Sequence, residues 1–231
     1  GLGRSVRKDG VETHVPTVQA ADIHGVIQAL DAGPVEVFGS SGGAVAALAL
    51  VTAHPEAVRT LVAHEPPLFS RLPDAAAAER AGQAVRDAYQ AKGFGAGMAA
   101  FITMTSWPGE FTDDYFARPP ADPAQFGMPT EDDGRRDDPL MTDRSLAVTA
   151  YKIDVEALTS VSTRVVIAVG EESVDVMTGR AALTIAAALG QQATVFPSHH
   201  GGFMGGEFGY AGQPEAFAKK LREVLDLSTE D

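Results

Sequence analysis

A serine in a turn of small residues is the clearest candidate for chemistry in this sequence. Residues 39–43 read Gly-Ser-Ser-Gly-Gly and fit the G-x-S-x-G pattern, with Ser41 at the centre. The β-favouring run 35–38 precedes this turn, and a run rich in Ala and Leu follows it. A sharp strand-to-helix turn holds such a serine under strain at a helix N-terminus, where free amides favour developing negative charge. The pattern predicts a nucleophile at Ser41 and an oxyanion donor at the Gly42 amide, with an ordinary Gly/Ser connection as the alternative.

A serine hydroxyl needs a base to take its proton, and the sequence offers a pair of histidines late in the chain. His199 and His200 follow the β-favouring run 193–196 and precede two glycines. Carboxylates follow two other such runs, Glu172 and Asp175 after 164–169 and Glu65 after 61–64. Loops beyond the carboxyl ends of parallel strands gather at one edge of a sheet, so these groups can share a site with the serine.

The rest of the chain alternates short apolar runs with segments of helical periodicity. Strands are expected at 35–38, 61–64, 164–169 and 193–196, and the intervening helices predict a mostly parallel sheet flanked by helices. Two Ala-rich or apolar helices, 74–91 and 94–107, a loop over 108–139 and a helix over 142–151 interrupt this alternation. We therefore expect an α/β core at 1–68 and 151–231 and a helical cap insertion at 69–150.

Composition narrows the functional classes. The formal charge of −13 argues against nucleic acid and anionic membranes as partners. The absence of cysteine excludes disulfides and a thiol nucleophile and is consistent with a cytoplasmic protein. No apolar run approaches the length of a membrane span. The acidic cluster at 131–138 is expected to be a solvated loop, with calcium binding as the alternative.

The succession of nucleophile, acid and histidine resembles the α/β-hydrolase family. The turn at 39–43, the interrupting cap, the acidic loop after Val169 and the histidine loop after Phe196 follow that family's order over essentially the whole chain. Residues 1–5 also look like the family's Gly-x-Gly-x-Ser stretch. The resemblance thus implies that the first strands, the oxyanion loop and the second oxyanion donor lie upstream of Gly1.

The resemblance also implies catalytic roles. Ser41 looks like the nucleophile, and His200 fits the general base better than His199 because His-Gly-Gly directly follows a terminal strand. The choice of acid is open, because Ser173 stands where the family often has aspartate.

Glu172, one residue before that serine, is the first choice for the acid. Asp175 is close enough to replace it. Glu65 follows the strand that comes after the serine turn, which is the family's alternative position for the acid. These three carboxylates are therefore the candidates.

Other residues have weaker functional signals. Some aromatic and sulfur side chains of the expected cap could line a substrate pocket, although packing within the cap is the commoner explanation for such residues: Phe101, Met104, Trp107 and Phe111. The remaining histidines have no metal-ligand spacing and are expected to pack or to face solvent: His14, His24, His54 and His64.

The sequence therefore favours a serine hydrolase that cleaves a small carboxylic ester or related acyl substrate without a cofactor or a metal ion. The alternatives are a cofactor-free perhydrolase or carbon–carbon bond hydrolase on the same scaffold, and a non-catalytic ligand-binding protein. The oligomeric state is open, with a homodimer as one candidate.

Overall fold

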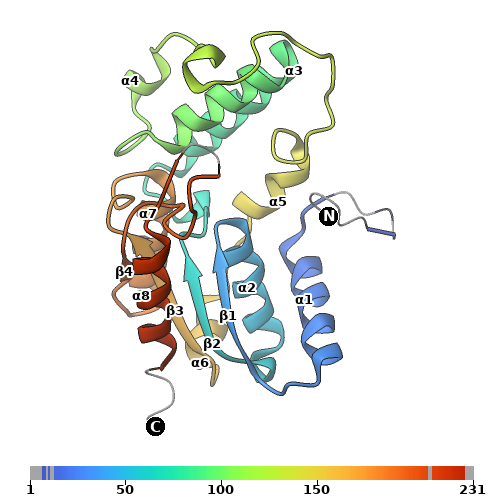
Figure 1. Ribbon diagram of the computed structural model, residues 1–231, viewed down its shortest axis with the longest axis vertical. Coiled ribbons are helices and arrows are strands. Elements are labelled where there is room, and N and C mark those ends of the chain that lie inside the picture. Colours follow the sequence, from blue (N-terminus) through green and yellow to red (C-terminus); the bar gives the residue numbers. More distant parts are fainter. Residues whose placement is uncertain (1–6, 9, 11–12, 208–209, 227–231) are drawn as a thin grey trace.

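A parallel sheet forms the centre of the molecule (Figure 1). The computed structural model describes residues 7–8, 10, 13–207 and 210–226. Four strands lie in the order β1-β2-β3-β4: β1 (Val35–Ser40), β2 (Val58–His64), β3 (Arg164–Gly170) and β4 (Thr194–Phe196). All neighbouring pairs are parallel. The expected α/β class and all four expected strands are confirmed.

Alternate residues of the central strands face two different layers of helices. Leu61 and Ala63 pack in one core with α1 (Pro16–Leu30), α2 (Gly42–Ala53) and α7 (Met177–Ala188), whereas Val62 packs with Phe217 of α8 (Pro214–Asp226) on the opposite face. The period of two in a strand produces this division. Short α6 (Val155–Ser160) joins the α2 side through Leu158.

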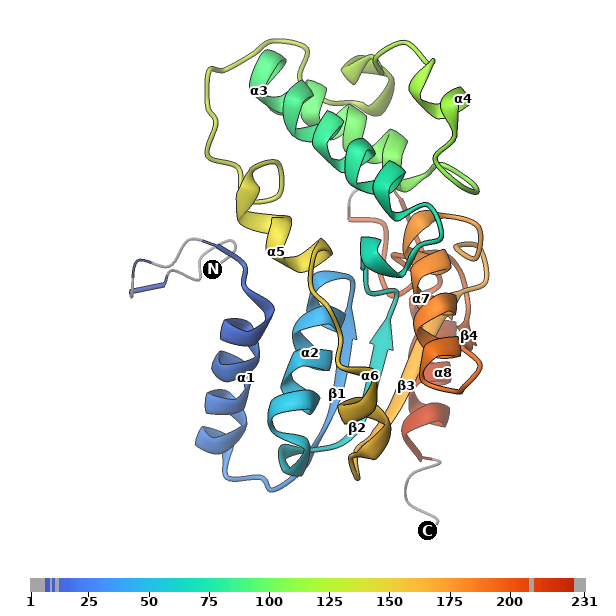
Figure 2. The same cartoon turned by 180° about the vertical axis from the view of Figure 1, so that it is seen from behind.

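The segment 69–150 lies beyond the carboxyl ends of the strands (Figure 2). It consists of η2 (Phe69–Arg71), α3 (Ala75–Thr105), α4 (Asp113–Phe116), η3 (Pro123–Phe126), η4 (Asp143–Ser145) and α5 (Leu146–Thr149). A hydrophobic cluster of its own includes Tyr89, Met104 and Met141 and extends to Met177 of α7. The division of the chain into a core and a cap stays a prediction.

One expectation for this segment is confirmed and one needs correction. The two helices expected at 74–91 and 94–107 both lie within α3, and they meet at Gly93, whose non-helical φ of 82° and ψ of −169° only glycine adopts readily. The helix expected at 142–151 is a 3₁₀ turn followed by the single turn of α5.

A buried ion pair joins the segment 69–150 to α7. The Arg180 guanidinium contacts the Asp74 carboxylate and donates a 2.6 Å hydrogen bond to the Gly109 carbonyl. The Phe111 amide donates to the same carboxylate at 2.7 Å. The side chains of Asp74 and Arg180 are only 8% and 13% exposed, so this contact is shielded from water. Among the described helices, none combines the length and apolar character needed to cross a bilayer.

Candidate active site

Ser41 lies at the tight bend between β1 and α2. Its backbone has φ 55° and ψ −127°, a conformation that strains a residue with a side chain. Its amide donates to the His64 carbonyl at 2.9 Å, which ties the bend to the end of β2. A Cβ on Gly39 would lie 2.7 Å from the Gly43 carbonyl oxygen, so only glycine allows the chain to turn this closely. The helix begins at Gly42, where first-turn amides lack intrahelical acceptors and can face an oxyanion.

Glu65 follows β2 at the neighbouring position of the same edge. Ser40 and His64 are paired in register, so Ser41 and Glu65 are the next residues along two adjacent strands. The Glu65 side chain is fully buried, and its two oxygens accept hydrogen bonds from the Gly170 amide at 2.8 Å and the Thr178 hydroxyl at 2.6 Å. The carboxylate is thus held in one orientation.

His200 supplies the third hydrogen bond to this carboxylate. Its Nδ1 lies 2.6 Å from Glu65 Oε2. Burial alone would raise the pKa of Glu65, but the hydrogen bond and the charge of His200, with help from His64 and Thr178, lower it to about 2. Glu65 is therefore ionised at neutral pH and accepts the Nδ1 proton. The His200 Nε2 then has its lone pair free, on a ring that is 38% exposed and can meet a substrate.

His199, the other candidate base, is held in the protein interior. Its Nδ1 accepts a 3.0 Å hydrogen bond from the Gly201 amide, and its Nε2 lies 3.1 Å from the Ala211 carbonyl. An acceptor role at Nδ1 leaves the proton on Nε2, which donates to Ala211. Tyr210 stacks on the ring at 3.7 Å between centroids. With both nitrogens engaged, His199 braces the loop that presents His200.

The structure pairs His200 with Glu65, the last of the three candidate acids, and not with Glu172. Glu172 and Asp175 are exposed, and no contact of either side chain with His200 is found among the described residues. The Glu172 amide instead donates to the Ser198 carbonyl at 3.1 Å. Glu65 directly follows a buried strand and points inward, so it is the candidate acid that contacts His200 among the described residues.

His64, for which the sequence indicates only packing or solvent exposure, is a buried part of this site. Its Nδ1 lies 3.1 Å from Ser40 Oγ, and its ring stacks 5.9 Å from that of His200. Its Nε2 lies 3.8 Å from Glu65 Oε1 and has no hydrogen-bond partner among the described residues. Burial lowers the pKa of His64 to about 4, although the charge of Glu65 opposes this. The ring is neutral at pH 7 and adds no positive charge beside His200.

The side chains expected to line a substrate pocket lie within the segment 69–150. Met104 and Phe111 are buried in its hydrophobic cluster, and Phe101 packs against that cluster. Trp107 and Phe111 both make edge contacts with Tyr115. A hollow of 630 Å³ near the start of α3 includes Phe111 and is lined by Ala76, Ala77, Arg80, Phe111, Thr112 and Asp113. Packing accounts for the contacts of these four side chains.

Two groups of residues bear on metal binding. In the cluster at 131–138, Asp132 pairs with Arg136 and Asp137 with Arg135, so these carboxylates are engaged with arginines rather than gathered round a cation. Elsewhere, among the described residues, His24, His54 and Glu56 bring potential ligand atoms together. They lie at the far end of α2 from Ser41.

No family model matches the sequence. Among curated proteins the chain is similar to an uncharacterized hydrolase, YraK, of Bacillus subtilis (strain 168), with 36% identity over 72 residues. That match spans 31% of this chain and only 27% of the relative.

Solved structures match over much more of the chain. BpoC of Mycobacterium tuberculosis H37Rv, assigned provisionally as a non-heme bromoperoxidase, aligns with a TM-score of 0.58 and 19% identity over 93% of this chain and 75% of that one. A thermophilic esterase from Thermogutta terrifontis aligns with a TM-score of 0.58 and 20% identity, covering 99% and 77%. At these identities, the likeness shows a shared fold.

Proposed function

We propose that this chain, which has the α/β-hydrolase fold, is a serine hydrolase that cleaves a carboxylic ester or a related acyl compound. In this proposal Ser41 is the nucleophile, His200 the general base and Glu65 the acid. The observation that carries the proposal is the 2.6 Å contact between His200 Nδ1 and the buried Glu65 carboxylate, beside the strained bend at Ser41. This is the histidine–acid arrangement that activates a serine hydroxyl.

The proposed reaction proceeds by acyl transfer to Ser41. His200 Nε2 takes the hydroxyl proton as Ser41 Oγ bonds to the substrate carbonyl carbon, and the carbonyl oxygen becomes an oxyanion. The Gly42 amide donates to that oxyanion. The intermediate collapses when the bond to the alcohol breaks and His200 returns its proton to the leaving oxygen. Water, deprotonated by the same ring, then releases the acid and restores Ser41.

The buried charge of Glu65 supports two parts of this cycle. It holds the Nδ1 proton of His200, so that Nε2 presents a lone pair to Ser41. It also stabilises the imidazolium that forms when the ring takes a proton, because the pKa of about 2 keeps the carboxylate ionised. The full burial of the Glu65 side chain keeps water and salt from screening this interaction.

The substrate would enter between the end of the sheet and the proposed cap at 69–150. The apolar side chain of Val148 in α5 lies beside Gly42, since its Cγ1 would be 3.4 Å from a Cβ built on that glycine. Gly42 is the proposed oxyanion donor, so Val148 favours an apolar substrate group near the reacting carbon. Of the four side chains expected to line the acyl site, the half-buried Phe101 and Trp107 remain proposed for this role, whereas Met104 and Phe111 are buried within the hydrophobic cluster of the segment 69–150.

The test is the steady-state hydrolysis of short p-nitrophenyl esters by the chain and by its Ser41→Ala variant. We expect turnover by the original chain and its loss in the variant, with unchanged circular dichroism. Equal turnover by both would overturn the assignment of Ser41. Peroxide-dependent halogenation without ester cleavage would favour perhydrolase chemistry instead, and ligand binding without either activity would favour a binding protein.

A further inference from the structure

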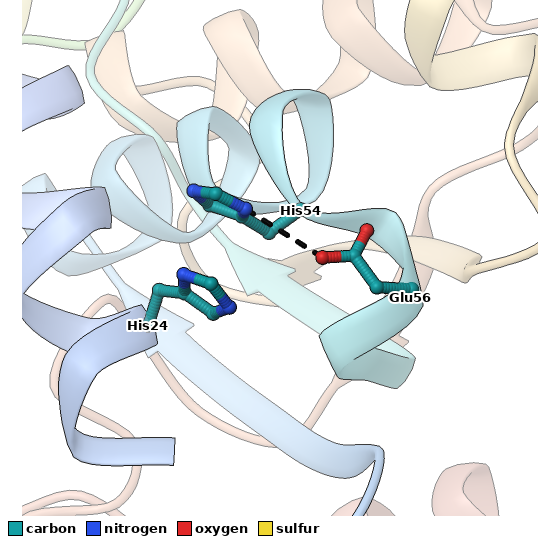
Figure 3. A group of neighbouring side chains, drawn as sticks. All are labelled: His24, His54 and Glu56. Carbon is teal, nitrogen blue, oxygen red and sulfur yellow. Dashed lines mark ion pairs between the residues drawn. The ribbon is translucent and has the colours of Figure 1, made fainter. Parts of the chain in front are cut away.

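Two histidines from different helices meet at the end of α2 that is remote from Ser41 (Figure 3). His24 lies in α1, and His54 caps the C-terminus of α2. Their rings stack with centroids 3.7 Å apart and planes inclined by 18°. Glu56, in the 3₁₀ turn η1 (Pro55–Ala57), brings a carboxylate oxygen to 3.6 Å from His54 Nδ1. One potential ligand atom from each of the three residues lies within 4.8 Å of the other two.

We propose that His24, His54 and Glu56 form a binding site for one divalent transition-metal ion, with Zn²⁺ as the best-suited ion. Two imidazole nitrogens and a carboxylate oxygen are ligands that zinc accepts, and water completes a four-coordinate shell. This site is independent of the proposed hydrolytic function. The sequence does not reveal this site, because His24 is far from His54 and Glu56 along the chain. The three residues meet only when α1 packs against the end of α2.

The side chains can close on an ion with small movements. Zinc–nitrogen bonds of about 2.1 Å place tetrahedral ligands about 3.4 Å apart. The ligand atoms lie within 4.8 Å of one another, so the widest separation must shrink by at most about 1.4 Å. The side chains of His54 and Glu56 are 32% and 70% exposed, so they have room to rotate. One ring must turn out of the stack, because the lone pairs of the two stacked rings lie in nearly parallel planes that do not meet at one ion.

Neither imidazole ring has a stronger competing partner. In the parts of the chain that the structure describes, the rings of His64, His199 and His200 all contact hydrogen-bonding groups. Within the described ranges, the rings of His24 and His54 make only the stack and the 3.6 Å contact with Glu56. A metal ion would therefore displace no hydrogen bond found among the described residues, and the net charge of −13 favours cation binding.

The position of the site points to a structural role. The 12 residues of α2 separate His54 from the Ser41 bend by about 18 Å at 1.5 Å per residue. A bound ion would link the middle of α1 to the junction between α2 and β2. Val26 and Leu30 of α1 are exposed, so α1 buries only part of its apolar surface. A metal link would therefore strengthen the attachment of α1 to the core.

The direct test is titration of the chain with Zn²⁺ by isothermal calorimetry. We expect one ion per chain, and binding at least about tenfold weaker in His24→Ala and in His54→Ala, since even groups that only orient ligands change affinity about 10- to 100-fold. The matched control is His14→Ala, which removes a histidine elsewhere and should bind as the original chain does. No saturable binding by the original chain, or unchanged affinity in both ligand variants, would overturn the proposal.

A second titration separates this site from zinc held by the proposed catalytic histidine. His200→Ala should retain the tight Zn²⁺ site, and its loss there would overturn the assignment to α1 and α2. In the original chain, ¹⁵N resonances of the His24 and His54 imidazoles should shift on adding Zn²⁺, a readout that needs no variant. At equal zinc concentration, the melting temperature of the original chain and of His14→Ala should rise more than that of His24→Ala. These outcomes are independent of ester hydrolysis.

Discussion

Replacing Glu65 by glutamine tests the role of the buried carboxylate with little change in size. The Gly170 amide is a fixed backbone donor 2.8 Å from Glu65 Oε1, so the amide oxygen of the new side chain must face it. The NH₂ group then faces the Thr178 hydroxyl, which can rotate and accept. It also faces His200 Nδ1, which must give up its proton to accept. The ring would then carry its proton on Nε2, where it cannot take one from Ser41.

The magnitude follows from this change of tautomer. The equivalent acid-to-amide change in a serine protease lowers kcat about 10⁴-fold, or about 5 kcal/mol of transition-state stabilisation. We expect a loss of this order in kcat for Glu65→Gln, with KM nearly unchanged because the carboxylate does not face the substrate. The assay is p-nitrophenyl ester hydrolysis at saturating substrate, with circular dichroism to establish folding.

Glu172→Gln is the matched control. Glu172 is exposed and its side chain has no described contact with His200, so its kcat should stay within about twofold of the original. The reasoning is refuted if folded Glu65→Gln retains kcat within tenfold of the original chain. It is equally refuted if Glu172→Gln loses as much activity as Glu65→Gln.

Three further predictions follow from contacts around the site. The pKa of His64 falls from 6.5 to about 4 on folding, so the unfolded chain binds more protons between those values. The stabilising contribution of neutral His64 should therefore be complete above pH 6.5, and the free energy of unfolding should fall by about 3 kcal/mol as the pH is lowered towards 4. In urea denaturation, His64→Gln should not show this dependence of the unfolding free energy on pH. Gly39→Ala puts a Cβ 2.7 Å from a backbone oxygen and should destabilise the fold by about 1–3 kcal/mol, whereas Gly43→Ala has open space and should not; melting curves compare them. Asp74→Ala leaves the Arg180 charge buried without its carboxylate and should lower the free energy of unfolding by about 3–5 kcal/mol. In urea denaturation, the double variant with alanine at both Asp74 and Arg180 should lose less of this free energy than the sum of the two single losses.

Local patterns predicted the elements that local chemistry determines. The strand expected at 35–38 and the bend at Ser41 follow from a β-favouring run beside small residues, and the structure confirms the strand as Val35–Ser40. The division of α3 into two helices likewise follows from Gly93, since glycine commonly ends a helix, and the structure confirms a non-helical backbone at this residue.

Choices between residues in different loops required the three-dimensional structure. Glu172 and Glu65 both follow strands, and no spacing in the sequence indicates which carboxylate points inward. Burial decides this, because Glu65 is enclosed by the Gly170 amide and Thr178 whereas Glu172 faces water. The proximity of His24 and His54 likewise depends on how α1 packs against α2.

The account depends most directly on covalent reaction at Ser41. The decisive measurement is mass spectrometry of peptides after treating the folded chain with a fluorophosphonate. We expect one adduct, located on Ser41, and its loss in His200→Ala, in which the base is removed. An active chain that carries no adduct at Ser41, or that reacts at another residue instead, would contradict the proposed mechanism.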